Sequence, residues 1–145
     1  MTIAVDTNIL VYAHRADSAF HEVAARRLRE LAEGSANWAI AWPCVYEFFA
    51  VVTHTRIYNP PTPQARALEQ IDMWLESPTL ALLTEDEAHW PALRALLASS
   101  LTVGPRAHDA RIAALCIANR VTALWTADRD FSRFPQLRVT NPLVG

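Results

Sequence analysis

Short apolar runs of strand length, most of them separated by longer stretches with helical periodicity, constrain the fold of this chain most strongly. Strands that alternate with helices form βαβ units, whose right-handed crossovers build a parallel sheet covered by helices. The pattern therefore predicts an α/β fold, a three-layer α/β/α sandwich with a central parallel sheet. The predicted strands lie at residues 2–5, 38–42, 80–83, 122–126 and 137–140.

Five segments between and beside these runs have the spacing of amphipathic or buried helices. The first ends at Gly34 as a C-terminal cap, and the third begins with Thr62 as its N-cap. The fourth must hold Pro91 in its first turn or kink there. The fifth is nearly all apolar after Arg111, which is typical of a helix packed on both sides. The predicted helices lie at residues 21–34, 43–55, 62–77, 86–100 and 107–120.

The length of 145 residues is typical of one domain, and no repeat or long linker divides the chain. We therefore expect a single domain over residues 1–145. The sequence has no apolar run of about 18 residues and no basic N-terminal segment leading into an apolar stretch, so we expect a cytoplasmic protein without membrane contact. Cys44 and Cys116 lie in apolar helical patterns, and we interpret both as small buried side chains.

Two absences exclude common classes of nucleotide-binding site. The chain has no lysine, since all thirteen of its basic residues are arginine, and it has only three glycines. A P-loop requires glycines that wrap the phosphate and a lysine that reaches it, and a dinucleotide-binding fold requires a GxGxxG turn. Neither class of site can be built from this sequence.

Carboxylates stand where the carboxyl ends of the predicted strands should meet. Asp6 follows the first strand, Glu47 lies one helical turn after the second, and Asp128 comes two residues after the strand at 122–126. Asp109 lies in the first turn of the helix that leads into that strand. Ligands of open parallel sheets bind outside the carboxyl ends of the strands. The four acids could therefore converge on one rim of the sheet.

Helix capping is the competing interpretation for three of these acids. Asp is a favoured N-cap and is stabilised in a first turn by the helix dipole, so Asp6, Asp109 and Asp128 could each serve as a cap. Glu47 differs, because it lies in mid-helix between Val45 and Phe48, where burial of an unpaired carboxylate is costly. We expect Glu47 to have a partner, either an arginine or a metal ion.

Four acids at one site would repel one another, raising their pKa values and destabilising the empty site unless cations bind. Oxygen ligands without His or Cys at ligand spacing select Mg²⁺ or Mn²⁺ rather than zinc. Such a site supports phosphodiester hydrolysis. Phosphorelay receivers and haloacid-dehalogenase-type phosphatases also place Asp after the first strand, but both need a later lysine, and the phosphatases need a second Asp where Asn8 stands.

Three segments together resemble the PIN-domain nuclease family, and more narrowly the VapC-type toxins of bacterial toxin–antitoxin pairs. They read "VDTNILVYA" from Val5, "WPCVYEFFAVVTHTRIYNPPTP" from Trp42 and "HDARIAALCIANRVTALWTADRDFSRFPQLRVTNPL" from His108. The resemblance implies a PIN-like fold and a metal-dependent endoribonuclease that inhibits translation by cutting RNA, either tRNA or rRNA. It further implies a cognate antitoxin whose tail occupies the acidic site, and a homodimer.

The resemblance also implies roles for individual residues. It gives catalytic and metal-binding roles to Asp6, Glu47, Asp109 and Asp128, with Mg²⁺ as the cofactor and Mn²⁺ as a substitute. Asn8 and Thr126 would orient carboxylates or water. Asp130 would either bind metal through water or cap the following turn. Tyr46 departs from the pattern, because many relatives have Ser at this position.

The net charge of −2 does not prevent RNA binding, because neutralising the four site acids would bring it to +2. Five arginines near the motifs are candidate phosphate contacts, with exposed or ion-paired surface residues as the competing interpretation: Arg15, Arg56, Arg106, Arg111 and Arg129. The apolar segments 48–52 and 71–74 are candidates for a dimer interface or ordinary core.

Two other functions remain open on the sequence alone. The first is a catalytically silent binding module, in which the acids cap helices and dock a basic partner tail. The second is a DNA-directed nuclease with the same fold. Divalent-ion binding that depends on Glu47 and Asp109 separates the first alternative from a nuclease, and a preference for DNA over RNA would identify the second.

Overall fold

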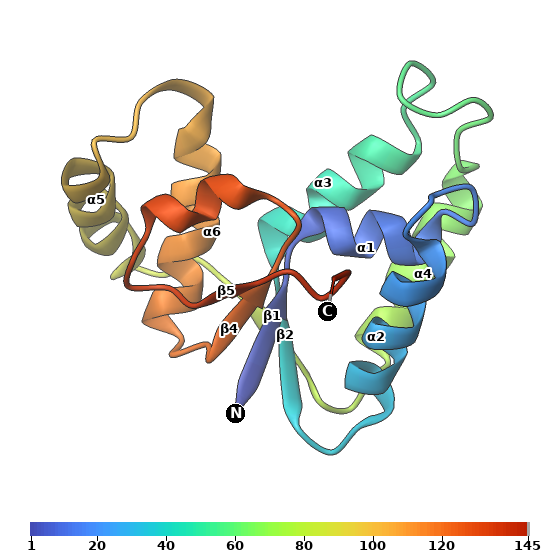
Figure 1. Cartoon of the computed structure of the whole chain (residues 1–145), viewed down its shortest axis with the longest axis horizontal. Helices are drawn as coiled ribbons and strands as arrows, with labels where there is room; N and C mark the ends of the chain where they lie inside the picture. Colours follow the sequence, from blue (N-terminus) through green and yellow to red (C-terminus); the bar gives the residue numbers. More distant parts are fainter. Residues whose placement is uncertain (145) are drawn as a thin grey trace.

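The computed structural model describes residues 1–144 and contains a five-stranded parallel sheet with the strand order β3-β2-β1-β4-β5 (Figure 1). The predicted α/β class is confirmed. Gly145, the last residue of the predicted domain, lies outside the described residues. The strands are β1 Thr2–Val5, β2 Asn37–Ala41, β3 Leu80–Leu83, β4 Ala123–Trp125 and β5 Val139–Thr140.

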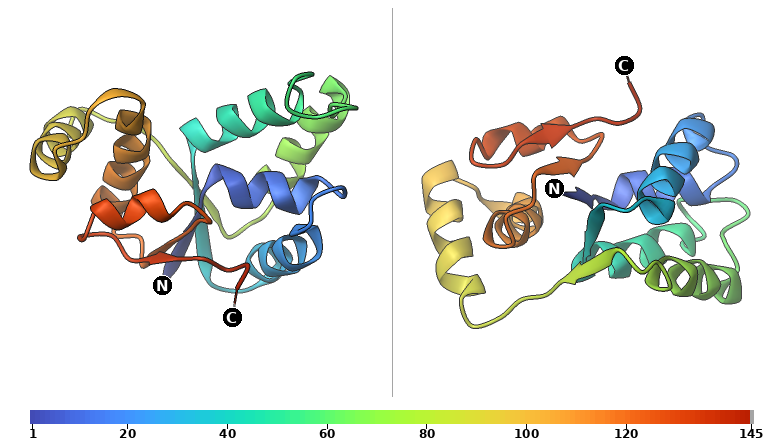
Figure 2. Two further views of the ribbon diagram at one scale, coloured as in Figure 1. Left: turned by 45° about the horizontal axis from the view of Figure 1, so that its top comes forward. Right: turned by 90° about the horizontal axis from the view of Figure 1, so that it is seen from below.

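Within residues 1–144, six α-helices cover the two faces of this sheet, which gives the predicted three layers. Figures 1 and 2 show α5 and α6 on one side and α1 to α4 on the other. Two short 3-10 helices, η1 at Gly104–Arg106 and η2 at Arg129–Arg133, lie near the carboxyl ends of the strands. The helices are α1 Thr7–His14, α2 His21–Glu33, α3 Trp42–Val52, α4 Gln64–Leu75, α5 His89–Ser100 and α6 Ala107–Ala118.

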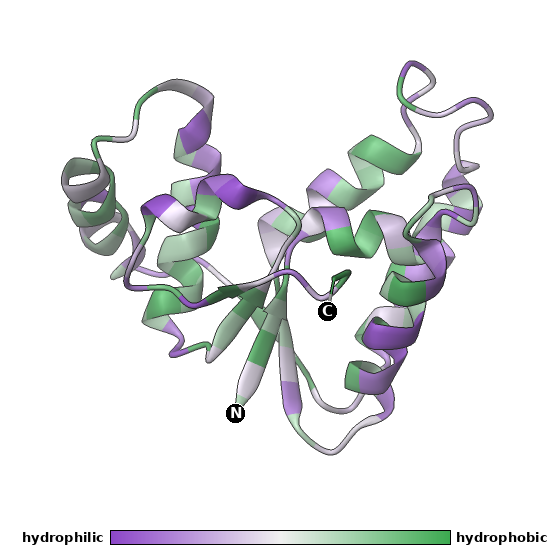
Figure 3. Ribbon diagram, in the orientation of Figure 1, coloured by the Kyte–Doolittle hydropathy of each residue, from purple (hydrophilic) through white to green (hydrophobic). Residues whose placement is uncertain are grey.

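The core lies between the sheet and its helices. Trp38 and Ile40 of β2 are fully buried, and α6 is buried along most of its length, as the apolar sequence after Arg111 predicts. Figure 3 shows the apolar residues gathered in the strands and the hydrophilic ones prominent on α2 and η2. Cys44 and Cys116 are buried free thiols, which confirms their predicted role as core residues. No helix within residues 1–144 is long and apolar enough to cross a membrane.

Two helix boundaries follow the predictions. α2 ends before Gly34, as expected, although Gly34 is extended rather than left-handed. Glycine fits this position because an added Cβ would lie 2.7 Å from the carbonyl oxygen of Glu30. Pro91 lies in the first turn of α5, where its missing N–H has no helical partner to lose.

The predicted N-cap at Thr62 is wrong. α4 begins at Gln64 with Pro63 as its N-cap, and Pro63 makes no side-chain capping bond. Thr62 is instead buried, and its hydroxyl accepts a hydrogen bond from Arg15 Nη1 at 3.2 Å and lies 3.1 Å from His14 Nε2. Its side chain therefore ties the loop before α4 to the end of α1.

Candidate active site

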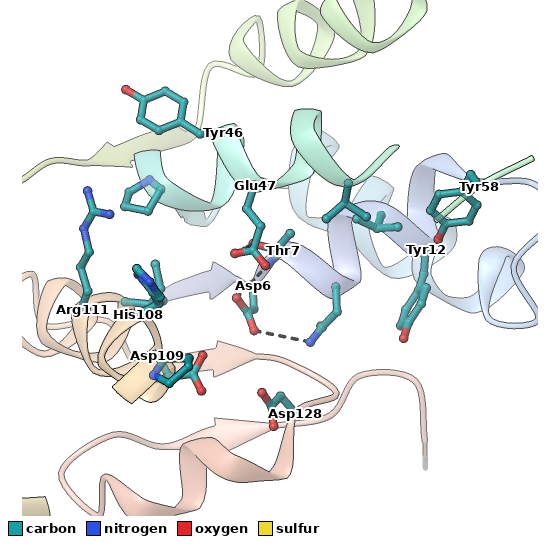
Figure 4. A pocket seen from close by; sticks show the side chains of 16 residues that line it. Asp6, Thr7, Tyr12, Tyr46, Glu47, Tyr58, His108, Asp109, Arg111 and Asp128 are labelled. Atoms are coloured by element: carbon teal, nitrogen blue, oxygen red, sulfur yellow. Dashed lines mark hydrogen bonds between the residues drawn. The ribbon is translucent and has the colours of Figure 1, made fainter. Parts of the chain in front are cut away.

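Four acids from distant parts of the chain line one pocket of about 690 Å³. Asp6 stands at the end of β1, Glu47 on α3, Asp109 in the first turn of α6, and Asp128 at the start of η2, just after β4. Figure 4 shows their side chains on the walls of this pocket. The structure thus brings together the four carboxylates that the sequence places near strand ends.

The parallel pairing of β1 with β4 explains why Asp6 and Asp128 lie at the same rim. Val5 pairs with Trp125, and the backbone N–H of Asp6 donates to the Trp125 carbonyl at 2.9 Å. Both strands end at this edge, and the polypeptide continues from β1 into α1 and from β4 into η2. The carboxyl ends of parallel strands lie at the same edge of the sheet, so the residues that follow these strands share one rim.

Asp6 caps α1 and lines the pocket at the same time. Its Oδ1 accepts a hydrogen bond from the backbone N–H of Thr7 at 2.8 Å, and its Oδ2 accepts one from the Thr126 hydroxyl at 2.7 Å. The Cys44 thiol lies 3.7 Å from Oδ1. These contacts leave the carboxylate with a single orientation. Capping and a site role are therefore compatible for this residue.

Burial raises the pKa of Asp6 to about 6, although the hydrogen bonds from Thr126 and Thr7 oppose the rise, while the charges of Glu47 and Asp109 add to it. Only 8% of the residue is exposed. Burial likewise raises the pKa of Asp109, with further increases from the charges of Asp128 and Asp130. The carboxylates are thus close enough to oppose one another's ionisation.

Asn8 and Thr126 connect the first acid to the fourth. The Thr126 hydroxyl accepts hydrogen bonds from Asn8 Nδ2 at 3.1 Å and from the backbone N–H of Asp128 at 3.0 Å. The side-chain carbonyl of Asn8 accepts a bond from the backbone N–H of Ala127 at 3.2 Å. This network fixes Asp6 against the turn that carries Asp128. Both polar side chains thus occupy positions from which they can orient carboxylates.

The prediction that Glu47 is buried is wrong. Glu47 and Tyr46 are exposed, because α3 turns Cys44, Val45 and Phe48 toward the core instead. The apolar residues near Glu47 in the sequence lie on the core-facing side of α3, whereas Glu47 lies on another side of the helix. Its partner is Thr7, a buried residue whose hydroxyl donates to Glu47 Oε2 at 3.2 Å.

Thr7 is a site residue that the sequence patterns did not reveal. It stands between two polar residues of the "DTN" motif, yet only their roles were predicted. A residue that directly follows a capping Asp is the first residue of the helix, and a hydroxyl at that position can reach a neighbouring element. This position in the sequence was the signal that could have identified Thr7. The pocket also contains Tyr12, Tyr58 and His108.

Asp130 does not line the pocket, and it is Asp128 that caps η2, by accepting the backbone N–H of Asp130 at 2.9 Å. The capping alternative for Asp130 is therefore wrong, and its contact to a metal ion through water stays a prediction. Asp130 forms an ion pair with Arg106, whose hydrogen bond lowers the pKa of this carboxyl. This pair joins the two 3-10 helices across the rim.

The five candidate arginines occupy different environments. Arg111 lines the pocket and forms an ion pair with Glu85. Arg15 lies outside the pocket lining and is engaged elsewhere, since it bonds both carboxylate oxygens of Asp17 and the Pro60 carbonyl and packs 4.2 Å from the centre of the Tyr58 ring. This environment agrees with the competing interpretation of Arg15 as an ion-paired residue. Arg56 and Arg129 are exposed and have no ion pair among residues 1–144.

The donors present suit a hard cation, but they are not gathered into a closed cage. Within the described part of the chain, no group of three or more His, Cys, Asp or Glu side chains is arranged to hold a metal ion. The pocket acids are oxygen donors, and the raised pKa values of Asp6 and Asp109 would fall if a cation bound beside them. Mg²⁺ usually keeps several waters and takes only one or two carboxylates together with substrate phosphates. The open arrangement of these acids is consistent with this mode of Mg²⁺ coordination.

Comparison with known proteins agrees with this geometry. Residues 3–137 match the family described as the PIN domain. The chain is 36% identical over 143 residues to ribonuclease VapC43 of Mycobacterium tuberculosis, covering 99% of this chain and 97% of the relative.

Solved structures share the fold. That of VapBC2 from Rickettsia felis, bound to a promoter DNA fragment, superposes with a TM-score of 0.68 at 22% identity and covers 97% of this chain and 98% of the other. That of Mycobacterium tuberculosis VapC20, a sarcin-ricin loop cleaving toxin, gives 0.64 at 18% identity and covers 90% and 92%.

Proposed function

The chain belongs to the PIN-domain family, and from this premise we propose that it is an endoribonuclease that acts as the toxin of a toxin–antitoxin pair. One observation carries the proposal: Asp6, Glu47, Asp109 and Asp128 line a single pocket at the carboxyl ends of the strands. The full-length similarity to a VapC ribonuclease supports RNA as the substrate. Cleavage of tRNA or rRNA would inhibit translation.

The proposed reaction is attack of water on phosphorus with loss of the 3′ oxygen, which leaves 3′-hydroxyl and 5′-phosphate ends. Mg²⁺, or Mn²⁺ in its place, would be held by Asp6, Glu47, Asp109 and Asp128 and would polarise the phosphate and activate water. Thr126 and Thr7 keep Asp6 and Glu47 in fixed orientations, so little reorganisation is needed when the substrate binds.

We further propose an antitoxin partner, whose basic tail would complement the acidic pocket, and a cytoplasmic location, where RNA and antitoxin are both present. The structures of VapBC complexes support such a partner, since their fold is shared. We also propose a homodimer, although the predicted interface segments 48–52 and 71–74 are largely core: Phe48, Val52 and Trp74 are buried. Met73 is exposed and remains available for contact.

RNA cleavage by purified protein tests this function. Asp6→Asn keeps the size of the side chain and should abolish cleavage in Mg²⁺, whereas Glu30→Gln, which removes an exposed acid on α2 outside the pocket, should cleave like the wild type. Mapping of the RNA ends should find 5′-phosphates. An Asp6→Asn variant with full activity would contradict the mechanism, and faster cleavage of single-stranded or flap DNA than of RNA would identify a DNA-directed nuclease.

A further inference from the structure

An exposed aromatic side chain stands at one end of the acidic pocket, and the proposed chemistry does not use it. Tyr46 directly precedes Glu47 on α3, lines the same pocket, and is 62% exposed. Figure 4 shows its ring on the side of Arg111 and directed away from the acids, while Glu47 points toward Asp6. A large aromatic ring that is exposed beside a polar pocket indicates a binding role more strongly than a buried ring does.

A neighbouring ring holds Tyr46 in place. Trp42, one helical turn earlier on α3, stacks on Tyr46 with ring centroids 5.9 Å apart and an angle of 22° between the planes. Trp42 is itself partly buried against the core. The stack orients the Tyr46 ring before a ligand arrives, which lowers the entropic cost of placing another ring beside it.

A cationic side chain lines the same end of the pocket. Arg111 is paired with Glu85, and both side chains are more than one third exposed. An ion pair in that environment is weak and can exchange partners with little cost. Aromatic rings combined with arginines along one groove are how proteins hold single-stranded nucleic acid, with the bases stacked and the backbone neutralised.

We propose that Tyr46, supported by Trp42, stacks on the base of a nucleotide beside the scissile phosphate, while Arg111 contacts a backbone phosphate of the same strand. This assignment rests on the proposed ribonuclease function. Stacking on a side chain requires a base whose face is free, so the nucleotide at this position is unpaired in the bound RNA. Tyr46 is then a residue that helps to select the cleavage site.

The test uses RNA that lacks single bases. Cleavage of a random-sequence RNA pool by the wild type first identifies a preferred sequence. Oligonucleotides of that sequence are then made with an abasic ribose at each of the nucleotides flanking the cut. Their kcat/KM values are measured for the wild type, Tyr46→Ala, Tyr46→Phe and Trp90→Ala. Trp90 is the matched control, because it is 59% exposed on α5 and lies outside the pocket.

At one flanking position, removal of the base should lower kcat/KM of the wild type and of Tyr46→Phe about tenfold, equivalent to about 1.4 kcal/mol. Tyr46→Ala should be about tenfold slower on intact RNA, mainly through KM, and should lose nothing further at that position. Trp90→Ala should match the wild type.

The assignment would be overturned if Tyr46→Ala remained as sensitive as the wild type to base removal at every position, whatever its overall rate. In that case RNA is still cut, the proposed function stands, and the exposed ring serves a protein contact instead. If the wild type cuts no RNA in the pool, the proposed function itself fails, and the Tyr46 assignment fails with it. The two failures are therefore distinguishable.

Discussion

Asp6 shows most clearly how a site residue differs from an ordinary helix cap. A cap at the surface gains stability from its charge, whereas burial raises the pKa of Asp6 to about 6, despite its hydrogen bonds. Ionisation of Asp6 therefore lowers the free energy of unfolding of the metal-free protein. A residue retained at such a cost is typical of a functional site.

This cost predicts an unusual pH dependence of stability. The folded-state pKa lies above the unfolded value of 3.8, so folding binds a proton between about pH 4 and pH 6, and stability falls as pH rises through that window. Above about pH 6 the penalty is complete, on the order of 3 kcal/mol at most. Asp6→Asn should remove it and unfold at higher urea concentration than the wild type at pH 7 in EDTA, with little difference at pH 4. Equal pH profiles for the two proteins would contradict this account.

At the scale of elements, the sequence predicted every strand and the two-sided burial of α6, because these features depend on runs of apolar residues. It did not predict α1, because this short helix begins directly after Asp6 and its buried run of Ile9, Leu10 and Val11 is too brief to show a helical period. The sequence also did not predict the exposure of Glu47, because the elements that pack against a short apolar helix determine which of its sides is buried.

The link between α1 and α3 gives a prediction at this scale. Thr7→Val removes the hydroxyl that binds Glu47 but keeps the side-chain volume and the backbone N–H that Asp6 caps. RNA cleavage should slow by about tenfold, because a hydrogen bond to a charged group contributes about 1.5 to 3 kcal/mol. Thr7→Ser should restore most of the rate. Wild-type activity in Thr7→Val would show that this contact does not position Glu47.

At the scale of the whole molecule, the parallel sheet accounts for the convergence of acids that lie more than a hundred residues apart. β1 and β4 are neighbours at its centre, so Asp6 and Asp128 meet at one rim, while α3 and α6 bring Glu47 and Asp109 from opposite faces (Figures 1 and 4). The alternation of runs in the sequence was enough to predict this rim. The contacts within it, such as the Arg106–Asp130 pair, depend on rotamers and loop paths that no periodicity encodes.

The central claim is that these four acids form a divalent-cation site for phosphodiester hydrolysis. Titration of the metal-free protein with Mn²⁺ in a calorimeter tests it most directly. The wild type and Glu30→Gln should bind the ion, and Glu47→Gln and Asp109→Asn should each weaken binding at least about tenfold, since a carboxylate near the cation contributes more than 1.4 kcal/mol. Binding that is unchanged in both variants, or absent from the wild type, would contradict the claim.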